Sequence, residues 1–157
     1  MRLHSFPTRR SSDPSDAKLA ADDRAEMAVP AVTASNAGDM AGAVRLFTDG
    51  VVGQAGAFDG LDASTRAMHL DNARTIPLHL RAPAPPSIGR ADLEGMTLRV
   101  AIARGESTRV CYRIPADTAH RYIPGSQLIV IPNGRHNAPI VHSLAFNNAL
   151  LGFLKES

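Results

Sequence analysis

The chain has 157 residues, a length typical of one domain, and 44% of them are hydrophobic, as in ordinary soluble proteins. Its net charge is only +2, and part of its arginine content lies before residue 25, which argues against a basic nucleic-acid-binding face. No apolar run approaches the roughly 20 residues of a membrane span. The single cysteine excludes an internal disulfide and is typical of a reducing, cytoplasmic compartment.

Residues 1–13 have neither hydrophobic periodicity nor the apolar segment of a secretory signal. The stretch 3–13 resembles a translated sequencing adapter, so we expect a disordered, non-native leader outside the fold. On this interpretation the N-terminal half of the original gene product is missing from the sequence. An organelle transit peptide is the alternative for such an Arg- and Ser-rich segment.

Residues 14–91 are expected to form a helical segment that ends in a proline-rich connector. The Ala-rich, charged stretch 14–33 predicts a short helix and a linker, with Pro30 as a breaker. A second helix is predicted after Asp39, which can act as its N-cap. Its apolar residues recur at helical spacing: Met40, Ala43, Val44, Phe47 and Val51.

Glycines and prolines mark the expected ends of helices in the residues that follow. Gly50 or Gly53 is expected to end the second helix and to begin a loop. Asp62 can cap a third helix, which we expect to end at Pro77. The Pro-rich stretch 82–86 predicts an extended connector.

In the rest of the chain, sequence patterns typical of strands alternate with patterns typical of helices. Alternating apolar residues over 98–103 predict a strand that is covered on both faces. A helical region over 108–122, interrupted at Pro115, leads to an apolar strand over 128–131, and Ser143 can cap a last helix. This order predicts an α/β fold with parallel strands and right-handed crossovers.

Each predicted strand is followed by a polar residue of a kind that often acts in catalysis. The strand over 128–131 is followed by a tight turn and His136, and the earlier strand is followed by Gly105 and Glu106. Ligands of an open α/β sheet bind beyond the carboxyl ends of its strands, so we expect His136 and Glu106 at the same edge. An acid followed by a histidine is the order found at the end of a nucleophile–acid–histidine triad.

Several motifs of this region stand in the order and spacing of a known family. They are the strand end Gly105-Glu106, the turn Ile123-Pro-Gly-Ser126, the strand Leu128-Ile-Val-Ile-Pro132, the pair Arg135-His136 and the stretch 145–154. Upstream, 43–53 and 66–75 look like cap helices of some members. With these motifs, residues 92–157 resemble the C-terminal part of an α/β-hydrolase core, and residues 14–91 resemble its cap or lid.

The resemblance implies an incomplete α/β-hydrolase fold, in which cap helices precede the last two parallel strands with their helices. It also implies an esterase-like mechanism with a serine, an acid and a histidine, in which His136 would be the general base. The acid would be Glu106 or a side chain from another strand. The position at which the family usually carries its acid is occupied here by Thr108, which cannot supply a negative charge.

The nucleophile elbow Gly-x-Ser-x-Gly and the oxyanion-hole loop of the family do not occur in the sequence. We therefore expect a fragment that is inactive by itself. Its intact parent would be a hydrolase that acts on a small-molecule ester or a related carbonyl compound.

Other residues of reactive type are weaker candidates. Cys111 could pair with His136 as a nucleophile, but its apolar surroundings predict a buried structural thiol. His69 and Asp71 are two positions apart on a predicted helix and would point to different faces, which disfavours a shared metal ion. We expect neither a metal nor an organic cofactor.

Two rival functions remain at this level. One is a small non-enzymatic α/β binding or scaffold protein, and the other is an acyltransferase or lyase on the same scaffold, because the fold does not determine the reaction. Nucleic acid and membrane are not expected as partners. A sheet that lacks its central strands has an open edge, which predicts low solubility or self-association.

Overall fold

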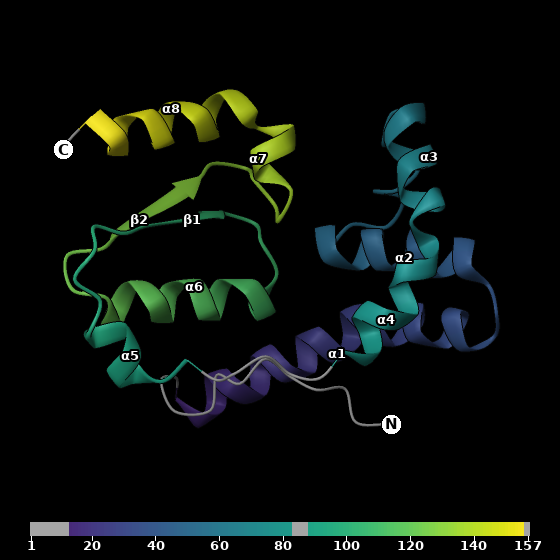
Figure 1. Cartoon of the computed structure of the whole chain (residues 1–157), viewed down its shortest axis with the longest axis horizontal. Helices are drawn as coiled ribbons and strands as arrows, with labels where there is room; N and C mark the ends of the chain where they lie inside the picture. The colour runs from purple at the N-terminus through teal and green to yellow at the C-terminus, as the bar shows by residue number, and fades with distance from the viewer. Residues whose placement is uncertain (1–12, 83–87, 156–157) are drawn as a thin grey trace.

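Figure 1 shows the computed structural model of the chain, which describes residues 13–82 and 88–155. Most of the expected leader and of the Pro-rich connector lies outside these residues. Asp13, which we had assigned to the leader, is the N-cap of the first helix, where its carboxylate accepts a hydrogen bond from the backbone N–H of Ser15 (2.8 Å).

The described residues form a helical part and then an α/β part, in the predicted order. The helical part consists of α1 (Pro14–Asn36), α2 (Met40–Val52), α3 (Ala63–Asp71), the 3₁₀ turn η1 (Ala73–Thr75) and α4 (Ile76–Arg81). The α/β part consists of α5 (Arg90–Glu94), β1 (Ala101–Gly105), α6 (Val110–Tyr122), β2 (Gln127–Ile131), α7 (Ala138–Val141) and α8 (Ser143–Lys155). Helix α5 spans the expected boundary between residues 91 and 92.

The predicted ends of α2 and the start of α3 are confirmed. The Asp39 carboxylate accepts a hydrogen bond from the N–H of Gly42 (2.8 Å), and the Asp62 carboxylate accepts one from Thr65 (2.9 Å). Gly53 ends α2 in the left-handed conformation, with φ of 73°. These short polar side chains and the glycine satisfy backbone groups that a helix end leaves without partners.

The predicted break at Pro30 was wrong, because α1 continues to Asn36. Pro30 is exposed, so its ring interrupts the hydrogen bonding on the solvent side of the helix. Buried residues flank it on the other side of α1, including Met27, Ala28, Ala31 and Val32. This apolar face, packed against the rest of the fold, keeps the helix continuous in spite of the lost hydrogen bond.

The third helix is shorter than predicted. It ends at Asp71, and the chain passes through η1 before α4 begins. Pro77 does not end a helix but lies near the start of α4, where its missing N–H costs nothing and its fixed φ suits the first turn. The Asn72 side chain donates a hydrogen bond to the Met68 carbonyl (2.8 Å), which satisfies one carbonyl at the end of α3.

The two strands are parallel, as predicted, and Ala101 pairs with Gln127 and Gly105 with Ile131. Strand β1 begins three residues later than expected, and Leu98 is 78% exposed outside it. Helix α6 is continuous, so the predicted interruption at Pro115 was wrong.

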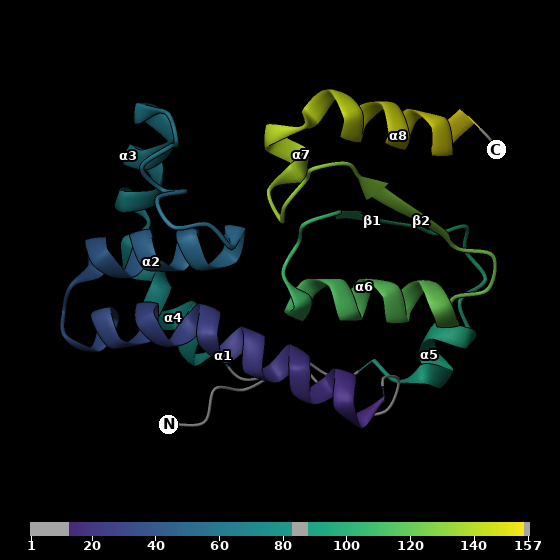
Figure 2. The ribbon, with the colours of Figure 1, turned by 180° about the vertical axis from the view of Figure 1, so that it is seen from behind.

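The described sheet lies between two helices. Figures 1 and 2 show α6 on one face of the β1–β2 pair and α8 on the other, in the three-layer order that the apolar strands predicted. Helix α1 runs along both parts of the molecule and packs against α2 and α6. Its contact with α6 buries one small core around Met27, Ala28 and Cys111. A second small core, around Val44, Phe58 and Ala73, lies within the helical part.

Among the helices that the structure describes, none combines the length and the apolar character needed to cross a lipid bilayer.

Candidate functional site

The turns that follow the two strands are packed tightly against each other. A Cβ atom added to Gly105 would lie 2.3 Å from the carbonyl oxygen of Gly134, so only glycine fits at this position. The N–H of Ser107 donates to the same carbonyl (2.8 Å), and the N–H of Glu106 donates to the carbonyl of Ile131 (3.0 Å). These contacts hold the two strand ends, and the residues that follow them, in one place.

His136 lies just beyond this pair of turns, on the connection from β2 to α7. Its ring stacks on Tyr112 of α6, with centroids 3.9 Å apart and planes 17° from parallel. His136 is nevertheless an exposed residue. Partial burial of the ring disfavours the charged imidazolium and therefore lowers the pKa of His136 below the ordinary value of 6.5.

A cavity of about 410 Å³ opens beside this imidazole. It lies between the sheet and the helices on both sides. Its lining includes Arg104, Thr108, Tyr112, Arg135, His136 and Phe146. A histidine of lowered pKa at the wall of a cavity near strand ends is an arrangement typical of a reaction site.

Glu106 reaches the same pair of turns but not the imidazole. It is exposed, and its carboxylate accepts a hydrogen bond from the backbone N–H of Asn133 (2.9 Å). Within residues 13–82 and 88–155, no carboxylate forms a hydrogen bond or ion pair with His136. Thr108, at the usual acid position of the resembling family, is buried and lines the cavity.

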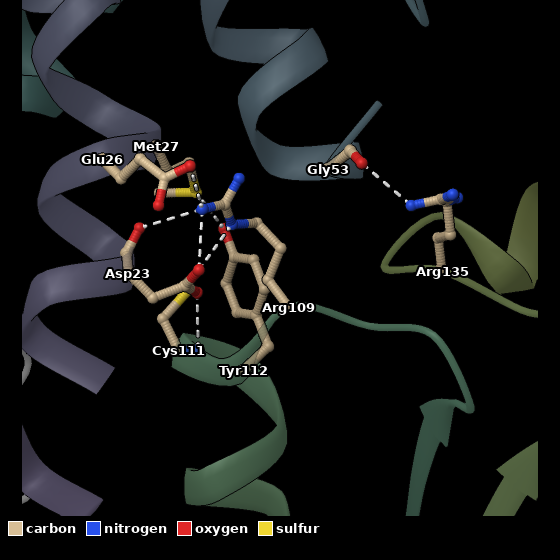
Figure 3. Close-up of polar contacts among 8 residues, drawn as sticks. All are labelled: Asp23, Glu26, Met27, Gly53, Arg109, Cys111, Tyr112 and Arg135. Carbon is tan, nitrogen blue, oxygen red and sulfur yellow. Dashed lines mark hydrogen bonds and ion pairs between the residues drawn. The ribbon is translucent and has the colours of Figure 1, made fainter. Parts of the chain in front are cut away.

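A polar junction that the sequence did not predict joins α1 to the start of α6 (Figure 3). The Asp23 carboxylate accepts hydrogen bonds from the Arg109 guanidinium (2.7 and 3.1 Å) and from the backbone N–H of Cys111 (2.9 Å). Beside it, the Tyr112 hydroxyl donates to the sulfur of Met27 (3.3 Å). More than 80 residues separate the partners, so no local pattern could have revealed them.

A second contact ties the helical part to the histidine turn. The Arg135 guanidinium donates a hydrogen bond to the carbonyl of Gly53, at the C-terminal end of α2 (2.9 Å, Figure 3). A cation at this end of a helix also interacts favourably with the helix dipole. The residue next to His136 is therefore anchored to α2 of the helical part.

A larger apolar cavity of about 420 Å³ lies between α2, α3, α4 and α7. Its wall is mainly apolar and includes Phe47, Met68, Ile76 and Ile140. Polar groups at its wall include Thr48 and His69, whose Oγ1 and Nδ1 atoms are 3.3 Å apart. Such a cavity fits the apolar part of a small molecule.

Cys111 has the surroundings of a structural thiol. It is fully buried, and burial is the main cause that raises its pKa to about 12. Among the residues that the structure describes, no group of three or more His, Cys, Asp or Glu side chains could hold a metal ion.

Comparison with known proteins identifies a structural relative. No family model matches the sequence, and no curated protein matches it. The crystal structure of a bromoperoxidase from Bacillus anthracis, an α/β-hydrolase-fold enzyme, is similar with a TM-score of 0.61 and 25% sequence identity. The match covers 83% of this chain and 47% of that chain, so this chain spans about half the length of its relative. The chain therefore has an α/β-hydrolase-like fold, and its two described strands agree with an incomplete form of it.

Proposed function

We propose that this chain supplies the cap and the histidine-bearing end of an α/β-hydrolase that cleaves esters or related carbonyl compounds. One observation supports this most directly. His136 lies beyond the carboxyl end of β2, at the wall of a cavity, in a fold similar to that of a hydrolase-fold enzyme. The nucleophile of such a site would come from the other half of the fold.

In the proposed mechanism His136 is the general base. Its lowered pKa keeps the imidazole neutral at pH 7, the form that can take a proton from a serine hydroxyl. The serine oxygen would then attack the carbonyl carbon of the substrate. His136 would return the proton to the leaving alcohol and would act again as the base for the water that releases the acid.

Glu106 is our proposed acid partner of His136. It follows β1 directly and lies on the turn that contacts the histidine turn. To orient the imidazole, its carboxylate would have to exchange the hydrogen bond from Asn133 for one from the ring N–H. A Glu106→Gln variant of the complete enzyme should therefore lose activity with little loss of folded protein.

The apolar cavity between the cap helices and α7 is the proposed site for the acyl part of the substrate. It adjoins α7, which follows the histidine turn, so a chain bound there would place its carbonyl group toward His136. Its apolar wall favours a medium-chain acyl group over a charged one.

Hydrolysis of p-nitrophenyl esters tests this function. We expect no saturable turnover by the 157-residue chain and clear turnover by a longer product of the same gene that includes an in-frame Gly-x-Ser-x-Gly. In the longer protein, His136→Ala should lower kcat by about 10³-fold or more. His142→Ala is the matched control, since that histidine follows α7 and does not line the smaller cavity.

Two outcomes would contradict the proposal. Turnover by the 157-residue chain that disappears in His136→Ala would show that the nucleophile is already present. A longer product without hydrolysis, but with saturable binding of an apolar ligand at the 420 Å³ cavity, would instead support a binding protein. Bromide oxidation should be assayed in parallel, because the solved relative is a bromoperoxidase.

A further inference from the structure

The imidazole of His136 rests on a side chain from another element. Tyr112 lies in the first turn of α6, and its ring is nearly parallel to the imidazole, with centroids 3.9 Å apart. Both rings line the 410 Å³ cavity. Contact over a whole ring face restricts the rotation of the imidazole more than a single hydrogen bond would, because tilting the ring would break many atomic contacts at once.

The Tyr112 ring is itself held by α1. Its hydroxyl donates to Met27 Sδ at 3.3 Å, and its ring packs against the small core of Met27, Ala28 and Cys111. Figure 3 shows the hydroxyl directed toward α1, away from Arg135 of the histidine turn. A tyrosine anchored at its hydroxyl end offers a fixed surface to the imidazole.

The backbone of Tyr112 is fixed by the ion pair beside it. The Asp23 carboxylate accepts hydrogen bonds from the N–H of Cys111 and from the guanidinium of Arg109, the residue before α6, which also donates to the Asp23 carbonyl (3.3 Å). The Asp23 and Arg109 side chains are 18% and 16% exposed, so solvent competes weakly for this contact. Helix α1 therefore holds the backbone of Tyr112 as well as its hydroxyl.

We propose that Tyr112 is a positioning residue for His136: its ring sets the orientation of the imidazole at the cavity wall, and α1 holds that ring through Met27. A contribution of Tyr112 to catalysis rests on the proposed function. The contact between Tyr112 and His136 does not rest on it, and the effect of this contact can be measured without any substrate.

The charged groups around His136 are engaged elsewhere. Arg104 of β1 pairs with Asp117 of α6 (2.7 Å), and Arg135 donates to the Gly53 carbonyl. The Glu106 carboxylate accepts a hydrogen bond from the N–H of Asn133.

The charged groups of α1 are also engaged. Asp23 pairs with Arg109, and Arg24 donates to the carbonyl of Cys111 (3.4 Å). Helix α8 contributes the apolar Phe146 to the cavity wall. The Tyr112 ring is the stacked neighbour of the imidazole, and burial of this kind disfavours the charged ring.

Hydrogen–deuterium exchange at the imidazole C2–H, read by mass spectrometry across a pH series, gives the pKa of each histidine in dilute full-length chain. Tyr112→Leu keeps an apolar side chain in the core but removes the flat ring. We expect it to raise the pKa of His136 toward 6.5, the ordinary value, because the imidazolium regains water. The exchange of His120 and His142, read in the same experiment, serves as the internal reference.

Two further variants separate positioning from general destabilisation. Tyr122→Leu changes the other tyrosine of α6, which lies under the Arg90 guanidinium (4.7 Å), and should leave the pKa of His136 unchanged. Met27→Leu removes the sulfur acceptor at nearly constant volume and should move the pKa of His136 in the same direction as Tyr112→Leu, but less. Circular dichroism checks that each variant is folded.

The proposal is overturned if folded Tyr112→Leu leaves the pKa of His136 unchanged, or if Tyr122→Leu moves it equally. An unchanged pKa in Met27→Leu would remove α1 from the proposal. None of these results depends on hydrolysis. Loss of esterase activity in a longer protein would therefore contradict the proposed function and leave this inference standing.

Discussion

At the scale of single residues, Asp23 connects the two parts of the molecule through hydrogen bonds from Arg109 and from the N–H of Cys111. Burial acts to raise its pKa, but the hydrogen bonds from Arg109 and from the Cys111 N–H outweigh that effect, so the pKa of Asp23 lies below the ordinary 3.8. A carboxyl group with a lowered folded-state pKa stabilises the fold above its unfolded pKa. That stabilisation is lost as the pH falls through the folded-state pKa.

We expect Asp23→Asn to lower the free energy of unfolding by about 2 kcal/mol at pH 7, because charged hydrogen bonds in a half-buried site are lost. The difference from the parent should shrink as the pH falls below about 4, where Asp23 begins to bind a proton in the unfolded chain, and should be lost below the lower folded-state pKa. Urea unfolding at several pH values, followed by circular dichroism, measures both effects.

The neighbouring residue supplies the control for this prediction. Asp22 pairs with Lys18 on the surface, where the two side chains are 61% and 76% exposed. Asp22→Asn should change the free energy of unfolding by less than about 0.5 kcal/mol. Equal effects of the two substitutions would mean that the junction between α1 and α6 contributes no more than a surface pair.

At the scale of elements, α1 and α6 each contain a proline in the helix interior, Pro30 and Pro115, but they compensate for it differently. A proline removes one N–H and leaves the carbonyl four residues earlier without its helical partner. In α6 that carbonyl belongs to Cys111 and accepts a hydrogen bond from Arg24 of α1 (3.4 Å). In α1, Pro30 is exposed, so water can reach the corresponding carbonyl.

We therefore expect Pro30→Ala to raise the free energy of unfolding by about 1–3 kcal/mol, because it restores a helical hydrogen bond and improves helix propensity. Pro115→Ala should gain clearly less, because Arg24 already satisfies the carbonyl and would have to give up its contact. Parallel urea titrations compare the two variants. A larger gain from Pro115→Ala would show that the Arg24 contact is unimportant.

At the scale of the whole molecule, the described sheet has only two strands, and the outer edge of β1 pairs with no other strand that the structure describes. Gln127 donates to the Val100 carbonyl and Glu106 donates to the Ile131 carbonyl, both at 3.0 Å. Since bonding direction alternates along a strand, the N–H of Ala103 faces the open edge. An open edge of this kind invites pairing with a second chain.

We expect the 157-residue chain to self-associate at micromolar concentrations, as seen by analytical ultracentrifugation. Ala103→Pro removes an outward N–H without touching the β1–β2 hydrogen bonds, so it should shift the chain toward monomer. Ile140 of α7 is 79% exposed, and Ile140→Lys tests whether the chain associates through the apolar surface of this helix instead. If that variant disperses the chain and Ala103→Pro does not, association runs through the apolar helix surface instead of the sheet edge.

The sequence by itself determined the elements whose signals are local. The apolar spacing after Asp39 predicted α2, and Gly53 marked its end. The two apolar runs predicted parallel strands, and the turn after the second run placed His136 beyond the end of β2. Its catalytic role, and that of Glu106, stays a prediction.

Only the tertiary structure determined the contacts between residues that lie far apart in the sequence. Packing keeps α1 continuous through Pro30 and α6 continuous through Pro115. It also brings Asp23 to Arg109 and stacks Tyr112 on His136. Glu106 accepts a hydrogen bond from Asn133 and does not contact His136 through one. The physical reason is that helix and strand signals repeat within a few residues, whereas buried ion pairs and ring contacts depend on which surfaces meet after the chain has packed.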